Sequence, residues 1–157
     1  MRIEELSGYL DRPAEAVDWL RGCGLTNIER AHSNLVHIAA SGVTLDLLAD
    51  ICDQLAQLLP GCPDADMALN NLDRFVAAAR NPLALGSLFE RDRDSLPYLV
   101  QIFSTSQYLS DRLITDSESY DLLRLTEGQP VARDVLAHEL TSEVLNAANP
   151  RSVLATL

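Results

Sequence analysis

The sequence predicts an all-α fold: an irregular bundle of several antiparallel helices with no β-sheet. Apolar residues recur along most of the chain at steps of three and four, as on one face of a helix, and the strict alternation of a half-buried strand is almost absent. Helix caps, glycines and prolines divide the chain into helix-length segments. We therefore expect a single helical domain over residues 1–157, with possible sub-bundles at 1–62 and 63–157.

The first forty residues predict two helices. Asp11 can cap a short helix that ends at Gly22 and Gly24, where glycine permits a left-handed backbone. The segment Thr26–Glu29 reads Thr-Asn-Ile-Glu, the pattern of a capping box, and opens a second helix that ends at 41–42, a Ser-Gly pair. The apolar residues of the second helix step along one face, which we expect to be buried.

Thr44 predicts the start of a third helix, which ends at 60–61, a Pro-Gly pair. A short turn between the second and third helices predicts antiparallel packing. The next helix carries Leu69, Leu72, Val76 and Ala79 on its buried line, and 81–82, an Asn-Pro pair, ends it.

Five more helical segments are expected towards the C-terminus. A short one covers 81–92, and Asp94 or Ser95 caps the next, with Pro97 in its first turn. Cap signals at 104–106 and 116–117 predict two short helices separated by a bend. The stretch 129–149 carries a last amphipathic pattern, and the apolar ending after it suggests a chain that continues.

Composition excludes several classes of function. The formal net charge of -11 repels phosphate backbones and anionic lipids, so we expect neither a nucleic-acid partner nor a membrane partner. No apolar run is long enough to span a bilayer and no signal peptide is evident, so a cytoplasmic protein is expected. The three cysteines and three histidines have neither disulfide nor zinc-ligand spacing, and buried free thiols are expected.

Two Asp-x-Asp pairs have the spacing that holds magnesium in nucleotidyl transfer. Asp64 and Asp66 lead into a predicted helix, so capping explains them. Asp92 and Asp94 follow a Gly-Ser pair, as in polymerase-beta-like nucleotidyltransferases, but only four residues separate Ser87 from Asp92 and no strand is predicted. We therefore expect no catalytic, cofactor or metal site in this chain.

Two segments, Ala68–Phe75 and Leu99–Leu109, lie within a stretch from about Asp64 to Arg124 that resembles the early part of the glutamine synthetase adenylyltransferase family, also called the adenylyl-removing enzyme. That family has an Ala-Leu-Asn-Asn-Leu-Glu-Arg segment followed by Leu-Leu-x-Leu-Phe-Gly-x-Ser-x-Tyr-Leu. The chain matches the first with Ala68, Leu69, Asn70, Asn71, Leu72, Asp73, Arg74 and Phe75, and the second with Leu99, Ile102, Phe103, Ser104, Ser106, Tyr108 and Leu109. Residues 116–118, Asp-Ser-Glu, replace a family His-Pro-Glu, and Ser104 stands where the family has glycine.

The resemblance implies a role without catalysis. Members carry two nucleotidyltransferase-like domains, one attaching AMP to a tyrosine of glutamine synthetase and one removing it, and both use magnesium, ATP being the AMP donor. The chain would be the N-terminal helical part of such a multidomain enzyme, inactive alone, with the catalytic domains, glutamine synthetase and the PII signalling protein as partners. The alternative is a free-standing acidic helical module that binds another protein through an exposed apolar stripe.

Helix formation alone does not explain why an Asn-Asn pair and an arginine lie in the first matched segment. Asn70 and Arg74 lie one turn apart, so we expect them to reach the same neighbour. The structural interpretation is that Asn70, Asn71 and Arg74 bind a loop or a helix end within the bundle. The functional interpretation is that they dock the chain onto a catalytic domain.

Overall fold

The computed structural model describes residues 1–79, 89, 92, 94–116 and 120. The chain divides into two compact units, Met1–Tyr120 and Asp121–Leu157, and every described residue belongs to the first. The described residues form seven α-helices and one 3-10 helix, with no strand among them, which confirms the all-α prediction. The helix expected at 129–149 and most of the one expected at 81–92 lie outside the described residues.

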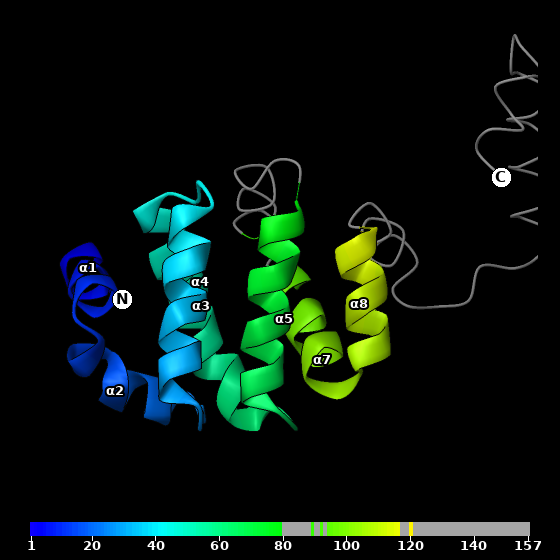
Figure 1. Cartoon of the computed structure of the whole chain (residues 1–157), viewed down its shortest axis with the longest axis horizontal. Helices are drawn as coiled ribbons and strands as arrows, with labels where there is room; N and C mark the ends of the chain where they lie inside the picture. Colours follow the sequence, from blue (N-terminus) through cyan, green and yellow to red (C-terminus); the bar gives the residue numbers. More distant parts are fainter. Residues whose placement is uncertain (80–88, 90–91, 93, 117–119, 121–157) are drawn as a thin grey trace, which may run out of the picture. The chain divides into compact units, whose positions relative to one another are not determined.

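Figure 1 shows the helices labelled in chain order. Their bounds are α1 (Ile3–Asp11), α2 (Pro13–Gly22), α3 (Ile28–Ala40), α4 (Leu45–Leu58), η1 (Leu59–Gly61), α5 (Ala65–Ala78), α7 (Ser95–Thr105) and α8 (Gln107–Thr115). Helix α5 is central to the packing, because it contacts α3 as well as α7 and α8. The helices before residue 62 contact those after it chiefly between α3 and α5, with smaller contacts between α4 and α7 and between η1 and α5.

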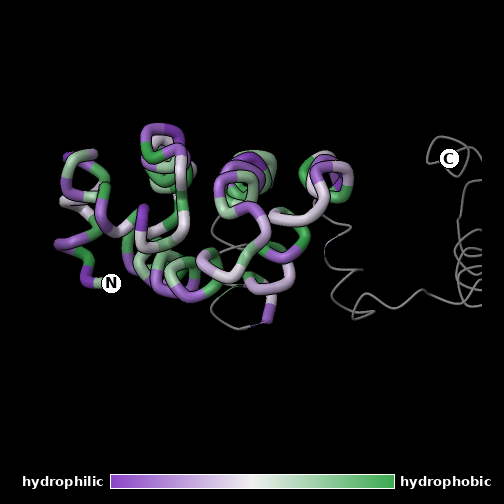
Figure 2. Tube along the Cα trace, turned by 90° about the horizontal axis from the view of Figure 1, so that it is seen from below, coloured by the Kyte–Doolittle hydropathy of each residue, from purple (hydrophilic) through white to green (hydrophobic). Residues whose placement is uncertain are grey.

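The buried residues form one hydrophobic cluster within Met1–Tyr120. The predicted line on α5 contributes Leu69, Leu72 and Val76, each at most 2% exposed. Figure 2 shows hydrophobic and hydrophilic residues alternating along the helices, as amphipathic packing requires. None of the described helices combines the length and the hydrophobicity needed to cross a membrane.

The N-terminal segment differs from the prediction. Residues before Asp11 form α1, which the sequence pattern did not predict, and Asp11 is the last residue of that helix instead of a cap. Helix α2 begins at Pro13, whose ring favours the first helical position and cannot continue a preceding helix. The predicted end of α2 is correct, since Gly24 has a φ of 81° in the left-handed region.

Three of the predicted caps are confirmed. The side chains of Thr44, Asp64 and Ser106 accept hydrogen bonds from the backbone N–H three residues ahead, at the starts of α4, α5 and α8. The capping box at Thr26–Glu29 is wrong in register, because Asn27 caps α3 by accepting from the N–H of Arg30. Thr26 instead donates to a carboxylate on α5.

Candidate functional site

The two adjacent asparagines on α5 face different neighbours. Successive helical residues point about 100° apart, so Asn70 and Asn71 cannot share a partner easily. Asn70 is partly exposed, and its Oδ1 accepts hydrogen bonds from Nε and Nη2 of Arg30 on α3, at 3.1 and 2.6 Å. Asn71 is fully buried and faces α7 and α8.

Asn71 is the centre of a polar group between α5 and α8. Its Nδ2 donates to the backbone oxygen of Phe103 at 3.2 Å, near the end of α7. Its amide also pairs with that of Gln107, which accepts from Nδ2 and donates to Oδ1, both at 3.2 Å. Arg74 donates to Asn71 Oδ1 at 3.0 Å and to Asp111 at 2.8 Å. We call Asn71, Arg74, Gln107 and Asp111 the Asn71 cluster.

The contacts of the Asn71 cluster differ from what the sequence predicted for Arg74 and agree with what it predicted for Asn71. Arg74 binds Asn71, three residues before it, and does not reach the partner of Asn70, because Asn70 points towards α3. Binding of a helix end within the bundle is confirmed for Asn71. The hydrogen bond from Arg74, followed by that from Gln107, holds the pKa of the exposed Asp111 carboxyl below its usual value.

The other residues of the resemblance divide into buried and exposed groups. Phe75 is buried, with its ring centroid 5.6 Å from that of Phe103 and 6.1 Å from that of Tyr120. Ser104 is also buried, and its hydroxyl donates to the backbone oxygen of Gln101. The buried group therefore holds α5 against α7.

The exposed group lies on α8 and on the α3 side of α5. Tyr108 is 74% exposed and Leu109 49% exposed, so neither belongs to the core. Ser106 caps the helix that carries them, accepting from the N–H of Leu109. Asp73 lies 3.4 Å from Nδ1 of His37 on α3.

Sequence reasoning missed three polar partners. Arg30 binds Asn70, Gln107 binds Asn71 and Asp111 binds Arg74, yet none of these three partners is a signature residue of the matched segments. Gln107 and Asp111 are four residues apart, and Nε2 of Gln107 donates to Asp111 at 2.9 Å. Such a pair at helical spacing is the signal that could have indicated them.

In each Asp-x-Asp pair, carboxylate oxygens accept hydrogen bonds from backbone N–H groups. Asp64 caps α5, and Asp66 accepts from the N–H groups of Thr26 and Asn27 and from the Thr26 hydroxyl. Asp92 accepts from the N–H of Asp94 at 3.2 Å. In the part of the chain that the structure describes, no three His, Cys, Asp or Glu residues are placed to hold a metal.

Asp66 acts as a cap across the interface between α3 and α5. Burial opposes its ionisation, but the hydrogen bonds from the Thr26 hydroxyl and from two backbone N–H groups outweigh that effect and lower its pKa. The carboxylate therefore stabilises the fold above about pH 4, and this contribution is lost as the pH falls through the lowered pKa. We expect Asp66→Asn to reduce the free energy of unfolding at pH 7 by about 1 kcal/mol. Urea unfolding at several pH values measures this, and the difference should shrink below about pH 4.

Asp73→Asn is the matched control on the same helix. Burial raises the pKa of Asp73 despite the nearby His37, so its ionised form opposes folding at neutral pH. Removing that charge should leave stability at pH 7 unchanged or raise it. Equal losses of stability in both variants at pH 7 would contradict the role assigned to Asp66.

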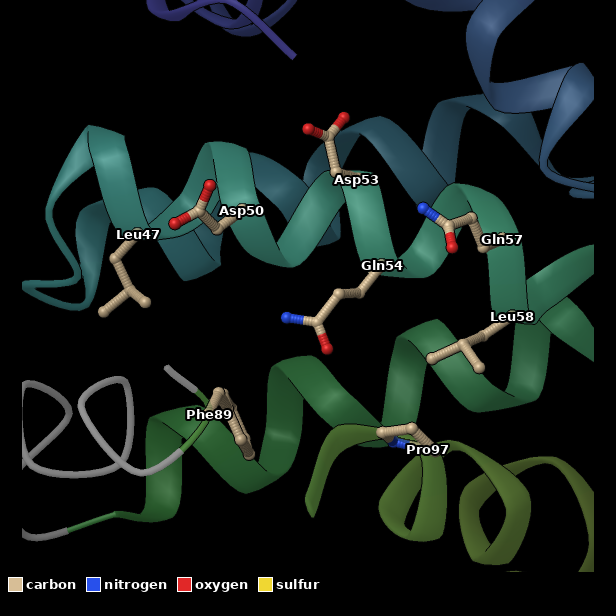
Figure 3. A pocket seen from close by; sticks show the side chains of 8 residues that line it. All are labelled: Leu47, Asp50, Asp53, Gln54, Gln57, Leu58, Phe89 and Pro97. Carbon is tan, nitrogen blue, oxygen red and sulfur yellow. The ribbon is translucent and has the colours of Figure 1, made fainter. Parts of the chain in front are cut away.

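A groove of about 540 Å³ lies between α4 and α7. Figure 3 shows Gln54 extending from α4 into the space facing Phe89 and Pro97, whereas Asp53 points away from it. The Asp53 carboxylate pairs with the N-terminal amine of Met1. The remaining polar side chains that line the groove are those of Asp50 and Gln57.

Cys23 and Cys52 are poor nucleophiles. Burial raises the pKa of Cys23 to about 11 and that of Cys52 to about 12, so both stay protonated near neutral pH. Cys62 is half-buried, and its thiol donates to the backbone oxygen of Leu58 at 3.3 Å. The buried free thiols expected from the sequence are confirmed at Cys23 and Cys52.

Comparison of the chain with protein-family models, with curated proteins and with solved structures finds no match.

Proposed function

We propose that this chain is a non-catalytic helical segment of a glutamine synthetase adenylyltransferase and deadenylylase. It supports the deadenylylating domain of an enzyme that controls nitrogen assimilation in the cytoplasm. Glutamine synthetase and the PII protein are its partners only through that larger enzyme, which supplies the sites for ATP and magnesium. The role of the chain is to hold neighbouring domains in place.

One observation carries this proposal. The two segments that resemble the family, 68–75 and 99–109, pack directly on each other through α5, α7 and α8. Asn71 and Arg74 of the first segment bind the Phe103 oxygen and Gln107 of the second segment, and Asp111 beyond it. Residues that were matched by sequence alone therefore lie together in one structural unit. This is expected if the two segments share a structural role.

Exposed apolar residues beside this unit support a docking role. Tyr108 and Leu109 belong to the matched residues, yet both leave much of their surface in water. Tyr98 on α7 is 48% exposed. Exposed aromatic residues next to a rigid helical interface are typical of protein contact sites.

The same exposed residues favour a second candidate function, an acidic helical module that binds an unrelated protein. The two candidates differ in what the gene encodes after codon 157. The proposed function requires a strand-borne Gly-Ser followed by Asp-x-Asp in the same reading frame. A stop codon directly after Leu157 would favour the interaction module instead.

The docking role is tested by co-expressing the 157-residue chain with the polypeptide encoded downstream and measuring co-purification. We expect the two to co-purify, and Tyr108→Ser combined with Leu109→Ser to reduce recovery by more than about tenfold, the size of a central interface contact. Glu29→Gln on α3 is a surface control that should change nothing. Normal recovery with the double variant would contradict docking through α8.

The same preparations test for catalysis by the chain itself. With glutamine synthetase, magnesium and labelled ATP, the isolated chain should leave incorporation of AMP at the level of a reaction without it. Transfer of AMP by the isolated chain would overturn the non-catalytic assignment.

A further inference from the structure

Helix α8 buries little apolar surface. Figure 1 shows it at the opposite end of the described helices from α1, and it contacts chiefly α5 and α7. Of its nine residues, Ser110 and Leu113 are buried and Ile114 is partly buried, so Leu113 is the one apolar side chain that α8 buries well. By contrast, α7 buries four apolar side chains, those of Leu96, Leu99, Val100 and Phe103. Apolar burial therefore holds α8 less firmly than it holds α7.

Polar and charged side chains supply the other contacts between α8 and α5. The Arg74 guanidinium lies 2.8 Å from the Asp111 carboxylate, and the two side chains are 42% and 51% exposed. The Gln107 amide pairs with that of Asn71 at 3.2 Å. An exposed ion pair contributes little to stability and is screened by salt. The attachment of α8 to α5 should therefore depend on ionic strength.

Aromatic residues on either side of α8 hold the chain in the core. The rings of Phe103, before α8, and Tyr120, after it, both pack against the ring of Phe75. The Tyr120 hydroxyl also donates to the backbone oxygen of Ser95, at the start of α7. The chain therefore leaves the core at Phe103 and returns to it at Tyr120, with α8 between these two fixed points. We call Gln107–Thr115 the α8 strap.

Separation of the α8 strap from α5 would leave the hydrogen bonds of the remaining core intact. Asn71 would keep its bonds to the Phe103 oxygen and from Arg74, because neither of these residues belongs to α8. The backbone at Ser106 is extended, with φ -143° and ψ 104°, so α7 and α8 are separate helices and α8 can move without breaking α7. A helix of nine residues is too short to persist alone, so the released strap should unwind.

We propose that the α8 strap opens as a local unit while the rest of Met1–Tyr120 stays folded, and that the ion pair between Arg74 and Asp111 makes this opening sensitive to ionic strength. Opening uncovers the face of α5 that carries Asn71 and Arg74, a carboxamide beside a guanidinium. The inference goes beyond the proposed function and does not rest on it, because it uses only the contacts of α5, α7, α8 and Tyr120.

Native-state hydrogen exchange of the ¹⁵N-labelled full chain, followed by nuclear magnetic resonance, tests the opening. The backbone amides of 110–115 in α8 should exchange at least about tenfold faster than those of 72–76 in α5. Low concentrations of urea should scarcely change the exchange rate in α8, because a local opening exposes little surface. The amides of 99–103 in α7 should exchange as slowly as those of α5, because Phe103 stays in the core.

Salt should change exchange in the α8 strap selectively. Raising sodium chloride from about 0.02 to about 0.5 M should speed exchange at 110–115 by roughly two- to fivefold, the effect expected of an exposed ion pair. Exchange in α5 should not become faster, because salt also weakens the repulsion within a chain of net charge -11.

Two variants test whether the ion pair is the cause. Arg74→Met and Asp111→Asn each remove one partner, so exchange at 110–115 should be roughly two- to fivefold faster at low salt and should no longer respond to added salt. Arg112→Gln on α8 is the matched control. It changes the net charge by the same amount as Arg74→Met but leaves the ion pair in place, so the response to salt should remain.

Three outcomes contradict the proposal. Equal exchange rates in α8 and α5 would show that the two helices unfold only together. Exchange at 99–103 as fast as that in α8 would show that the strap has no fixed end at Phe103. A response to salt that survives both Arg74→Met and Asp111→Asn would show that the overall charge of the chain, and not the ion pair, controls the opening.

Discussion

Phe75→Ala is expected to lower the free energy of unfolding of the Met1–Tyr120 unit by about 3–5 kcal/mol, the range for removing a buried phenylalanine. The ring is 1% exposed and packs against Phe103 of α7 and against Tyr120. Its loss opens a cavity at the interface between α5 and α7 and removes two aromatic contacts. Urea unfolding followed by Trp19 fluorescence measures the effect, because Trp19 is the single tryptophan and lies in α2.

Tyr98→Ala is the matched control for the loss of an aromatic ring. Tyr98 lies on α7 and is 48% exposed, so its removal leaves no cavity and should change stability by less than about 0.5 kcal/mol. Similar losses in the two variants would show that Phe75 does not lie in a packed core.

Asn71→Ala is expected to cost about 2–3 kcal/mol, because it leaves the buried backbone oxygen of Phe103 without its donor and removes the partner of Gln107. Arg74 also loses one acceptor, although its contact with Asp111 remains. The loss should appear in the same urea assay as a lower midpoint with an unchanged slope.

The adjacent asparagine provides a control of identical chemistry. Asn70→Ala breaks only the contact with Arg30, an exposed residue, and should cost less than about 1 kcal/mol. A difference between two neighbouring asparagines isolates burial as the cause. If both variants lost the same stability, the Asn71 cluster would not be the anchor of α8.

Helix content follows closely from the sequence pattern, and helix starts follow from it where the cap is local. Thr44, Asp64 and Ser106 cap their helices as expected, since a cap depends on a side chain and a backbone N–H three residues away. Thr26 was misassigned because its hydrogen bonds go to Asp66, forty residues along the chain. A sequence pattern over a few residues cannot reveal a hydrogen-bond partner that lies so far along the chain.

The candidate site was predicted in part. The sequence singled out Asn71, Arg74 and Phe75, all of which form interhelical contacts. It could not pair Arg74 with Asp111, because that contact depends on how α8 lies against α5.

The sequence by itself determined the helical class, most helix ends and the buried lines of the helices, because periodicity, caps and glycine or proline stops act over a few residues. The tertiary structure alone decided that Asn70 turns to α3 and Asn71 to α7 and α8, and that Asp66 caps a helix from across an interface. It also placed Phe103 and Tyr120 against the same ring, that of Phe75. The physical reason is that partners of polar side chains are set by which helices pack together, and that packing buries apolar surface from distant parts of the chain.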